Sequence, residues 1–372
     1  MNKLFSIFLI FTAPLVAVTE YQVEPLTKTS NFGEAFYSHT PTGVLFGTQY
    51  GEPAADTPPI LVPEEPKEEP IASAKPAKRT AQFFAYDSNS GKSRTFSLDN
   101  KATNLTSEHI SSKNVSNDHG RVASLVSCFN EGHDGVECEV LSQFVIYGEP
   151  MSELQVIELP KSKSSPFTEI ALTNNNELVV GTSVQPEFYL YAESNWQPLE
   201  VGENAASVHL MTSTFNDVLM ISEENSEFTA VKSYAIARNR SHQLFRTDGC
   251  DFCPSHVNKK LCVAGECDGE TFAGGDELFL RDAKGQFHYT TGIDILDLSD
   301  DGLVLIEEGD TIETTYLFDI RENRFCLYDL IQNPSTLKGI TRVLCFGRGD
   351  EIYAETRTPG KAPELVRIIP AN

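Results

Sequence analysis

The sequence predicts an all-β fold, namely a β-propeller of seven blades with four antiparallel strands in each blade. Three observations predict it. A unit made of an apolar run, a polar turn and a second apolar run recurs along the chain. Each copy continues with a second pair of strand-like runs, and the copies repeat at intervals in the low forties. Four short strands in about 40 residues are typical of a propeller blade.

The interval is measured from the first apolar residue after each polar turn. These residues are Val44, Val122, Leu178, Val218, Leu261, Leu303 and Ile352, and they lie 78, 56, 40, 43, 42 and 49 positions apart. The first interval contains the Pro-rich segment 52–79, and the second contains the loop between Cys128 and Cys138. These two additions account for the longest intervals, so the repeat itself is in the low forties.

The outer half of each predicted blade is an aromatic and aliphatic run, a turn and another run. Such residues suit pleated, half-buried strands. The clearest examples are 81–98, 187–201, 276–289 and 315–328. The strand-like residues 20–26 are predicted to complete the last blade beside 364–369. Closing the ring in this way protects edges that would otherwise recruit other strands.

One unit carries a family resemblance. Thr-Asn-Asn-Asn-Glu-Leu-Val-Val-Gly-Thr-Ser over 173–183, followed by Glu-Phe-Tyr-Leu-Tyr over 187–191, resembles the HAF-type extracellular repeats of bacterial exported proteins. In those repeats an Asn-x-x-Gly turn precedes Val-Val-Gly, and the resemblance is best over 168–191. It implies a secreted, propeller-like scaffold and provides no defined catalytic residues.

The N-terminus has the plan of a secretory signal peptide. Lys3 precedes an apolar run over 4–18, and polar residues follow it. This run is shorter than the ~20 residues that span a bilayer as a helix. We therefore expect a signal peptide over 1–19, export to the periplasm or the extracellular space, and no membrane insertion after cleavage. The alternative is an uncleaved signal anchor.

The rest of the chain divides into one domain and one insertion. A single propeller domain is predicted over 20–51 and 80–372. Residues 52–79 are rich in Pro and charged residues, and Pro disfavours both helix and sheet ladder. We expect this segment to be a disordered insertion, and the alternative is a docking tether for a partner.

Charge limits the classes of partner. The chain has 29 Lys and Arg residues against 53 Asp and Glu residues, which gives a formal net charge of −24. Nucleic-acid binding requires a surplus of basic residues that face phosphates, so we expect no nucleic-acid partner. An acidic surface also disfavours anionic lipid, whereas a basic protein partner complements it.

All cysteines lie after the predicted signal peptide, and their even number in an exported chain predicts disulfides. The candidates are Cys128, Cys138, Cys250, Cys253, Cys262, Cys267, Cys326 and Cys345. Four of them form the local quartet C-x2-C-x8-C-x4-C over 250–267. Four thiolates can also hold zinc, but export favours two disulfides because oxidised sulfurs are not thiolate ligands.

One acidic turn has the spacing of a calcium loop. Asp297, Ser299 and Asp301 alternate, Gly302 follows, and Glu308 stands at the twelfth position. The flanking residues alternate like strands, however, and no helix is predicted on either side. The competing interpretation is a solvated β-turn, and we assign no metal ligand and no cofactor.

The sequence indicates a binding function. It contains no HExxH, GxSxG, P-loop or GxGxxG motif, so no catalytic residue is assigned. We expect an exported, monomeric, non-catalytic propeller that binds a protein or a glycan. One alternative is a propeller hydrolase or lyase, in which His and carboxylate side chains of several blades converge at the central channel. The other is a structural envelope component.

Overall fold

The computed structural model describes most of the predicted propeller. The described residues are 20–28, 34–51, 80–98, 109–129, 140–163, 165–201, 205–211, 218–248, 252–267, 276–309, 312–319, 323–332, 340–356 and 364–371. The predicted signal peptide, the Pro-rich segment 52–79, Cys138 and Cys250 lie outside them, so the expectations for these parts remain predictions.

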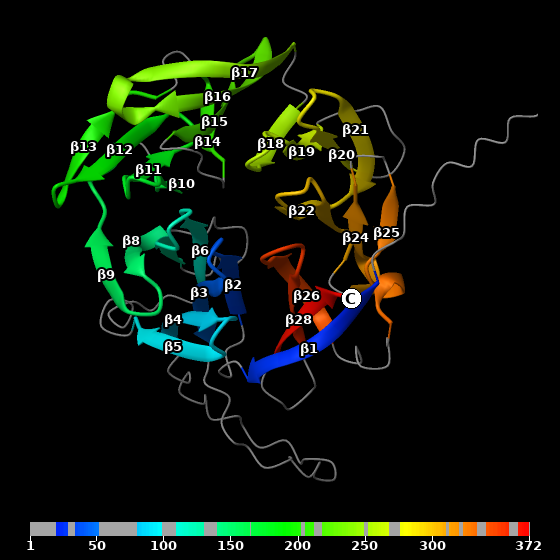
Figure 1. Ribbon diagram of the computed structural model, residues 1–372. Coiled ribbons are helices and arrows are strands. Elements are labelled where there is room, and N and C mark those ends of the chain that lie inside the picture. The colour runs from blue at the N-terminus through cyan, green and yellow to red at the C-terminus, as the bar shows by residue number, and fades with distance from the viewer. Residues whose placement is uncertain are drawn as a thin grey trace, which may run out of the picture.

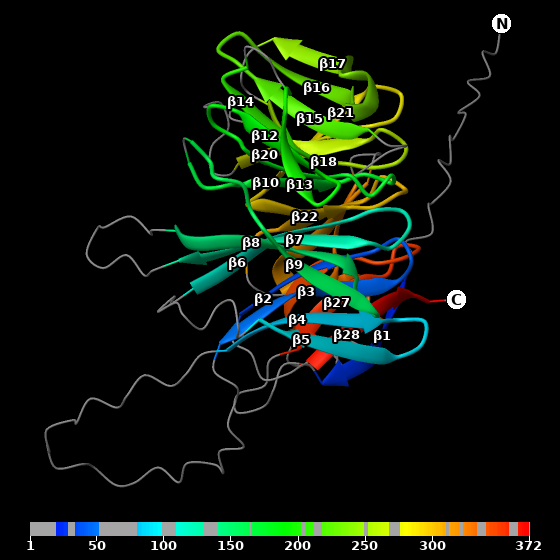
Figure 2. The ribbon, with the colours of Figure 1, turned by 90° about the vertical axis from the view of Figure 1, so that its left-hand side faces the viewer.

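The described strands form seven four-stranded antiparallel sheets around a central axis (Figure 1), and this confirms the predicted fold. Figure 2 shows the ring from the side. Blade 1 contains β2 (Glu34–His39), β3 (Val44–Gly51), β4 (Thr80–Asp87) and β5 (Lys92–Ser97). Blade 2 contains β6 (His109–Ser116), β7 (Val122–Phe129), β8 (Val140–Glu149) and β9 (Glu153–Glu158). Blade 3 contains β10 (Glu169–Leu172), β11 (Leu178–Thr182), β12 (Glu187–Ala192) and β13 (Asn195–Leu199).

The next three blades have the same order of strands from the axis outward. Blade 4 contains β14 (Ser207–Leu210), β15 (Leu219–Glu224), β16 (Phe228–Ala235) and β17 (Arg240–Asp248). Blade 5 contains β18 (Phe252–Val257), β19 (Val263–Cys267), β20 (Asp276–Arg281) and β21 (Phe287–Gly292). Blade 6 contains β22 (Asp294–Leu298), β23 (Val304–Glu307), β24 (Thr315–Phe318) and β25 (Arg324–Cys326).

Blade 7 joins the two ends of the chain. Its strands are β26 (Ile340–Phe346), β27 (Ile352–Thr356), β28 (Glu364–Pro370) and, outermost, β1 (Tyr21–Lys28). β1 pairs antiparallel with β28, with Tyr21 opposite Pro370. Tyr21 is only 2% exposed, and Arg367 contacts Glu24 at 2.8 Å. The predicted closure by the N-terminal strand is thereby confirmed.

Helix is confined to short 3₁₀ segments among the described residues. They are η1 (Ile236–Arg238), η2 (Ile312–Thr314) and η3 (Tyr328–Leu330). None of the described helices has the length and apolar character that a membrane crossing requires. The core instead lies between neighbouring blades, where strands such as β7 and β11 are buried on both faces. This explains why their sequences are almost continuously apolar.

The recurring polar turn has the same hydrogen bond and backbone conformation in five blades. The side-chain oxygen of the first turn residue accepts the backbone N–H of the fifth residue at 3.0–3.1 Å, and the first residues are Thr40, Asn117, Thr173, Asn258 and Ser299. The fourth residue has a positive φ in each case: Gly43, Gly120, Asn176, Leu261 and Gly302. Glycine and asparagine tolerate this conformation best, which explains the Asn, Asp and Gly content of the turns.

Asn117 also joins its turn to that of the next blade. Its Oδ1 accepts the N–H groups of His119 and Arg121 at 3.1 and 3.0 Å. Its Nδ2 donates to the carbonyl of Thr173 at 3.1 Å and to Oδ1 of Asn176 at 3.0 Å. The side chain of Asn117 has no exposed surface. Loss of this amide would therefore leave several buried polar groups without a partner.

We expect Asn117→Ala to lower the free energy of unfolding by about 2 kcal/mol, because unsatisfied buried groups cost more than a lost surface hydrogen bond. Urea unfolding followed by tryptophan fluorescence measures this change. Asn195→Ala is the matched control, because Asn195 is exposed and its side chain makes one hydrogen bond, to the carbonyl of Glu193. Equal losses for the two variants would contradict a joining role for Asn117.

Candidate functional site

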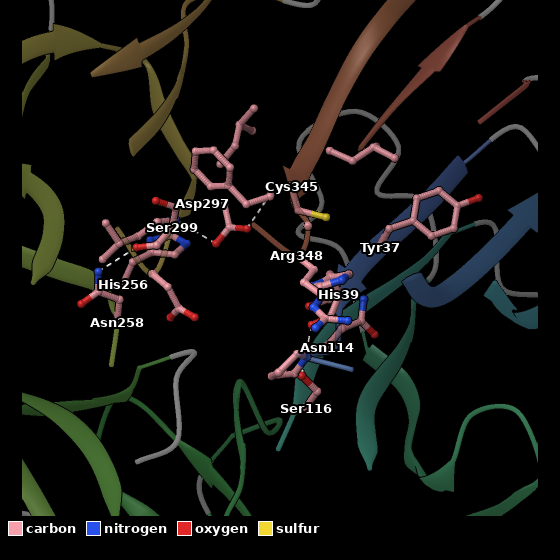
Figure 3. Close-up of a pocket in the computed structure, with 18 of the residues that line it drawn as sticks. Tyr37, His39, Asn114, Ser116, His256, Asn258, Asp297, Ser299, Cys345 and Arg348 are labelled. Atoms are coloured by element: carbon pink, nitrogen blue, oxygen red, sulfur yellow. Dashed lines mark hydrogen bonds between the residues drawn. The ribbon is translucent and has the colours of Figure 1, made fainter. Parts of the chain in front are cut away.

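A polar cavity of about 880 Å³ lies at the central channel, at the end where the inner turns meet (Figure 3). Its walls come from the inner strands β2, β6, β18, β22 and β26 and from the turns that follow them. Five of the seven blades therefore contribute, and their contributions are widely separated in sequence. We call this cavity the channel mouth.

One side of the channel mouth is acidic. Asp294, Asp297 and Asp300 line it, and none of them has an ion-pair partner within the part of the chain that the structure describes. Oδ1 of Asp297 accepts the N–H of Leu298 at 2.8 Å, and Oδ2 accepts the N–H of Phe346 in blade 7 at 2.9 Å. Burial raises the pKa of Asp297 to about 6 and also raises that of Asp294. Within the described ranges no cation forms an ion pair with Asp294 or Asp297 that would offset this effect of burial.

The other side carries Arg348, His39, Asn114 and Ser116, which Figure 3 shows opposite Asp297 and Ser299. Arg348 is exposed in the turn of blade 7 and forms no ion pair within the described residues. Burial lowers the pKa of His39 to about 4, so its ring is neutral at pH 7. The buried Nε2 atom of His39 has no hydrogen-bond partner among the described groups.

A charged network crosses the channel wall in blades 2, 3 and 4. Nζ of Lys113 lies 2.8 Å from Oε2 of Glu169, and Nδ1 of His209 lies 3.4 Å from Oε1 of Glu169. The N–H of Leu210 also donates to Glu169, at 2.8 Å. Glu169 itself is only 3% exposed. Each of the three charged side chains comes from the innermost strand of its blade, so the network fastens three blades together.

The network sets the protonation of its members. Burial alone would raise the pKa of Glu169, but the contacts with His209 and Lys113 outweigh it and lower that pKa. The hydrogen bond with Glu169 raises the pKa of His209. Glu169 is therefore held as a carboxylate, and His209 is more readily protonated than an ordinary histidine.

The residues with the spacing of a calcium loop are not brought together. Asp301 contacts Lys260, and Glu308 contacts Arg324. Oγ of Ser299 accepts the N–H of Leu303 within the turn, while Asp297 faces blade 7. Among the described residues, no group of His, Cys, Asp and Glu side chains has metal-binding geometry. The structure therefore supports the interpretation of this segment as a β-turn.

The cysteine quartet is divided along a hairpin. Cys262 precedes β19 and Cys267 ends it, and five residues of extended chain span about 17 Å. Cys253 pairs with Glu266, at the Cys267 end of the ladder. Cys262 therefore does not share a tetrahedral zinc shell with Cys253 or Cys267. Cys250 lies outside the described residues.

The disulfide predictions are not confirmed. Within the described residues the structure contains free thiols at Cys128, Cys262, Cys326 and Cys345. Sγ of Cys326 donates to the carbonyl of Glu313 at 3.5 Å. Cys345 is buried in β26, and burial raises the pKa of its thiol. Cys138 and Cys250 are not among the described residues, so disulfide formation stays a prediction.

Sequence reasoning missed Lys113, Glu169, His209 and Arg348 as site residues. A usable signal exists for His209, a titratable residue between the apolar Val208 and Leu210, and a weaker one for Glu169, which precedes the apolar run 170–172. Lys113 gives no such signal, because it lies between Ser112 and Asn114. Arg348 gives no such signal, because an arginine in a polar turn is ordinary. Its importance depends on which side chains of other blades stand opposite.

These features define the chain as a seven-bladed β-propeller with a polar channel mouth. Its sequence matches no protein-family model and no curated protein, so the HAF-type resemblance remains a prediction. Virginiamycin B lyase from Staphylococcus aureus is structurally similar, with 9% identity, a TM-score of 0.51, and coverage of 94% of this chain and 99% of that chain.

Two further solved structures have comparable similarity. The WD40 repeats of RRP9 give 10% identity and a TM-score of 0.50, covering 94% of this chain and 98% of that one. The β-propeller domain of the Trilobed protease from Pyrococcus furiosus gives 8% identity and a TM-score of 0.50, covering 91% and 94%. At such low identity these similarities establish the fold alone.

Proposed function

We propose that the protein is an exported, non-catalytic scaffold that binds a basic segment of a partner protein at the channel mouth. The observation that carries the proposal is a set of carboxyl groups that form no ion pair among the described residues, Asp294, Asp297 and Asp300, on one side of a cavity of about 880 Å³. Export rests on the predicted signal peptide over 1–19.

A basic side chain fits this site for two physical reasons. Its charge compensates that of Asp297, which is partly withdrawn from water, where electrostatic attraction is stronger than at an open surface. The net charge of −24 also attracts basic partners over a longer range and speeds their association at low salt. A glycan without positive charge gains neither contribution.

We expect the affinity for a basic peptide to fall roughly fivefold between pH 7.5 and pH 5, the effect of losing one partly exposed charge pair. Asp297 is charged above its pKa of about 6 and neutral below it. His39 and His256, with pKa values of about 4, remain neutral throughout this range. Fluorescence anisotropy with labelled Gly-Lys-Gly-Lys-Gly measures the affinity. Asp297→Asn is expected to reduce the pH dependence to the part that Asp294 and Asp350 contribute, because burial raises the pKa of these two carboxyl groups as well.

The controls separate binding at the channel mouth from general attraction. Glu153→Gln removes an exposed carboxylate on the outer strand β9, and it is expected to keep both the affinity and its pH dependence. A second peptide has Gln in place of each Lys. If the wild-type protein binds the Lys and Gln peptides equally at pH 7.5, the proposed function is wrong.

A hydrolase or lyase is the second candidate function, and the pair of Glu169 and His209 favours it. A carboxylate that orients an imidazole is the arrangement that a general base requires, and the side chain of His209 is 42% exposed. His209→Gln distinguishes the candidates. If the protein is a scaffold, His209→Gln leaves the affinity for the basic peptide unchanged. If His209 is a general base, the variant still binds a substrate but no longer converts it.

A further inference from the structure

The cations of the channel mouth differ in whether they are already paired. Lys259 contacts Asp118 at 2.7 Å, and Lys113 contacts Glu169 at 2.8 Å. Arg348 also lines the mouth, but it forms no ion pair within the described part of the chain. A guanidinium that lines a concave site and is not held in an ion pair is suited to a carboxylate from outside.

A second observation points to a ligand on the same side. The side chain of His39 is half-buried, and the residue lines the cavity. Its Nε2 has no hydrogen-bond partner among the described groups, although buried polar groups almost always have one. The ring is held 5.7 Å from that of Tyr353, centroid to centroid. Arg348 and the neutral His39 thus offer a charged donor and an unsatisfied polar atom on the side of the mouth opposite Asp297 (Figure 3).

The two sides of the mouth therefore have opposite requirements. Among the described residues, neither Asp297 nor Arg348 forms an ion pair, while Asp300 lies in the field of Lys260 and Arg348 in that of Glu351. Asp297 and Arg348 do not pair with one another, because they lie on different sides of the cavity (Figure 3). A ligand with one charge satisfies only one side. A ligand that carries both charges a short distance apart satisfies both sides at once.

We infer that the channel mouth binds the C-terminal residue of a polypeptide that ends in Lys or Arg. The basic side chain would lie toward Asp297 and Asp300, and the α-carboxylate toward Arg348. A chain end suits a concave cavity because the bound segment continues into solvent on one side only. An internal segment would have to continue into solvent on both sides. Capture of a terminal carboxylate is a recurring mode of peptide recognition. This inference rests on the proposed function and specifies its ligand.

The test uses three labelled peptides that share the sequence Gly-Ser-Gly before the last residue. The first ends in Lys with a free carboxylate, the second ends in Lys amide, and the third ends in norleucine with a free carboxylate. We expect the first to bind the wild-type protein roughly fivefold more tightly than either of the others, because each of them lacks one charge pair. Fluorescence anisotropy at pH 7.5 provides the affinities.

Two variants test which side of the channel mouth binds each charge of the peptide. Arg348→Gln is expected to abolish the difference between free carboxylate and amide while keeping the preference for Lys over norleucine. Asp300→Asn is expected to reduce the preference for Lys while keeping the preference for the free carboxylate. Arg240→Gln, on the outer strand β17, is the matched control and should behave as the wild type. Circular dichroism confirms that each variant is folded.

The outcomes separate this inference from the proposed function. If both Lys peptides bind equally and more tightly than the norleucine peptide, the scaffold function stands and C-terminal recognition is wrong. If none of the peptides binds, the proposed function fails as well. If free lysine competes as effectively as the peptide, the ligand is a small amino acid, which overturns recognition of a polypeptide end.

Discussion

Tyr21→Ala should lower the free energy of unfolding by about 3–5 kcal/mol, the range for truncation of a large buried aromatic side chain. Tyr21 is 2% exposed and belongs to a core cluster that includes Leu330, Ile331 and Ile368. Its carbonyl also accepts the N–H of Gln332 at 3.0 Å. The substitution removes the apolar anchor of the strand that completes blade 7, and urea unfolding at pH 7 measures the loss.

The neighbouring residue provides a control on the same strand. Gln22 is exposed and faces away from the core, so Gln22→Ala should change stability by less than about 0.5 kcal/mol. Because β1 covers the edge of β28, Tyr21→Ala should also increase aggregation, measured by light scattering. A Tyr21→Ala protein as stable as the Gln22→Ala protein would show that β1 contributes little to ring closure.

Glu169→Ala should lower the free energy of unfolding by about 3 kcal/mol, which is at the lower end of the range for breaking a buried charge pair. The lower end applies because Lys113 and His209 are 35% and 42% exposed and water in the channel partly solvates the charges left behind. Glu169→Gln should cost less, since the amide oxygen still accepts the N–H of Leu210. Urea unfolding of both variants measures the difference.

The loss in Glu169→Ala should depend on pH. The pKa of Glu169 is lowered from 4.5, so its contribution is present above pH 4.5 and is lost as the pH falls through the lowered value. The pKa of His209 is raised from 6.5, so its contribution is present below pH 6.5 and is lost as the pH rises through the raised value. The difference in the free energy of unfolding between wild type and Glu169→Ala is therefore expected to be largest at about pH 5.5. A gap independent of pH from 3 to 9 would contradict this account.

The blades were predictable because each is a local unit. An apolar run, a polar turn and a second run are contiguous, and strand alternation and turn chemistry act over a few residues. Val44, Val122, Leu178 and Ile352, chosen as the first apolar residues after the turns, begin β3, β7, β11 and β27. Ring closure was also predictable, because 20–26 is a strand without a local partner.

The channel mouth was not predictable, because it forms only when five blades meet. Asp297 and His39 come from different blades, and no local pattern connects them. Linear spacing alone did not determine which side chains meet, for the same reason. The calcium spacing of Asp297, Asp301 and Glu308 falls on a hairpin, where these side chains find separate partners. The cysteines over 250–267 are close in sequence, but an extended strand moves Cys262 away from Cys267.

The pairing of Glu24 with Arg367, 343 positions later, has a consequence for biogenesis. Apart from the contact of Tyr21 with residues 331–332, β1 has no hydrogen-bonded neighbour among the described strands until β28 has been made. Completion of the toroid is therefore a late event, and contacts between residues so distant in sequence slow folding. A nascent chain that stops short of Glu364 would lack β28, so β1 would present an unpaired strand edge that favours aggregation.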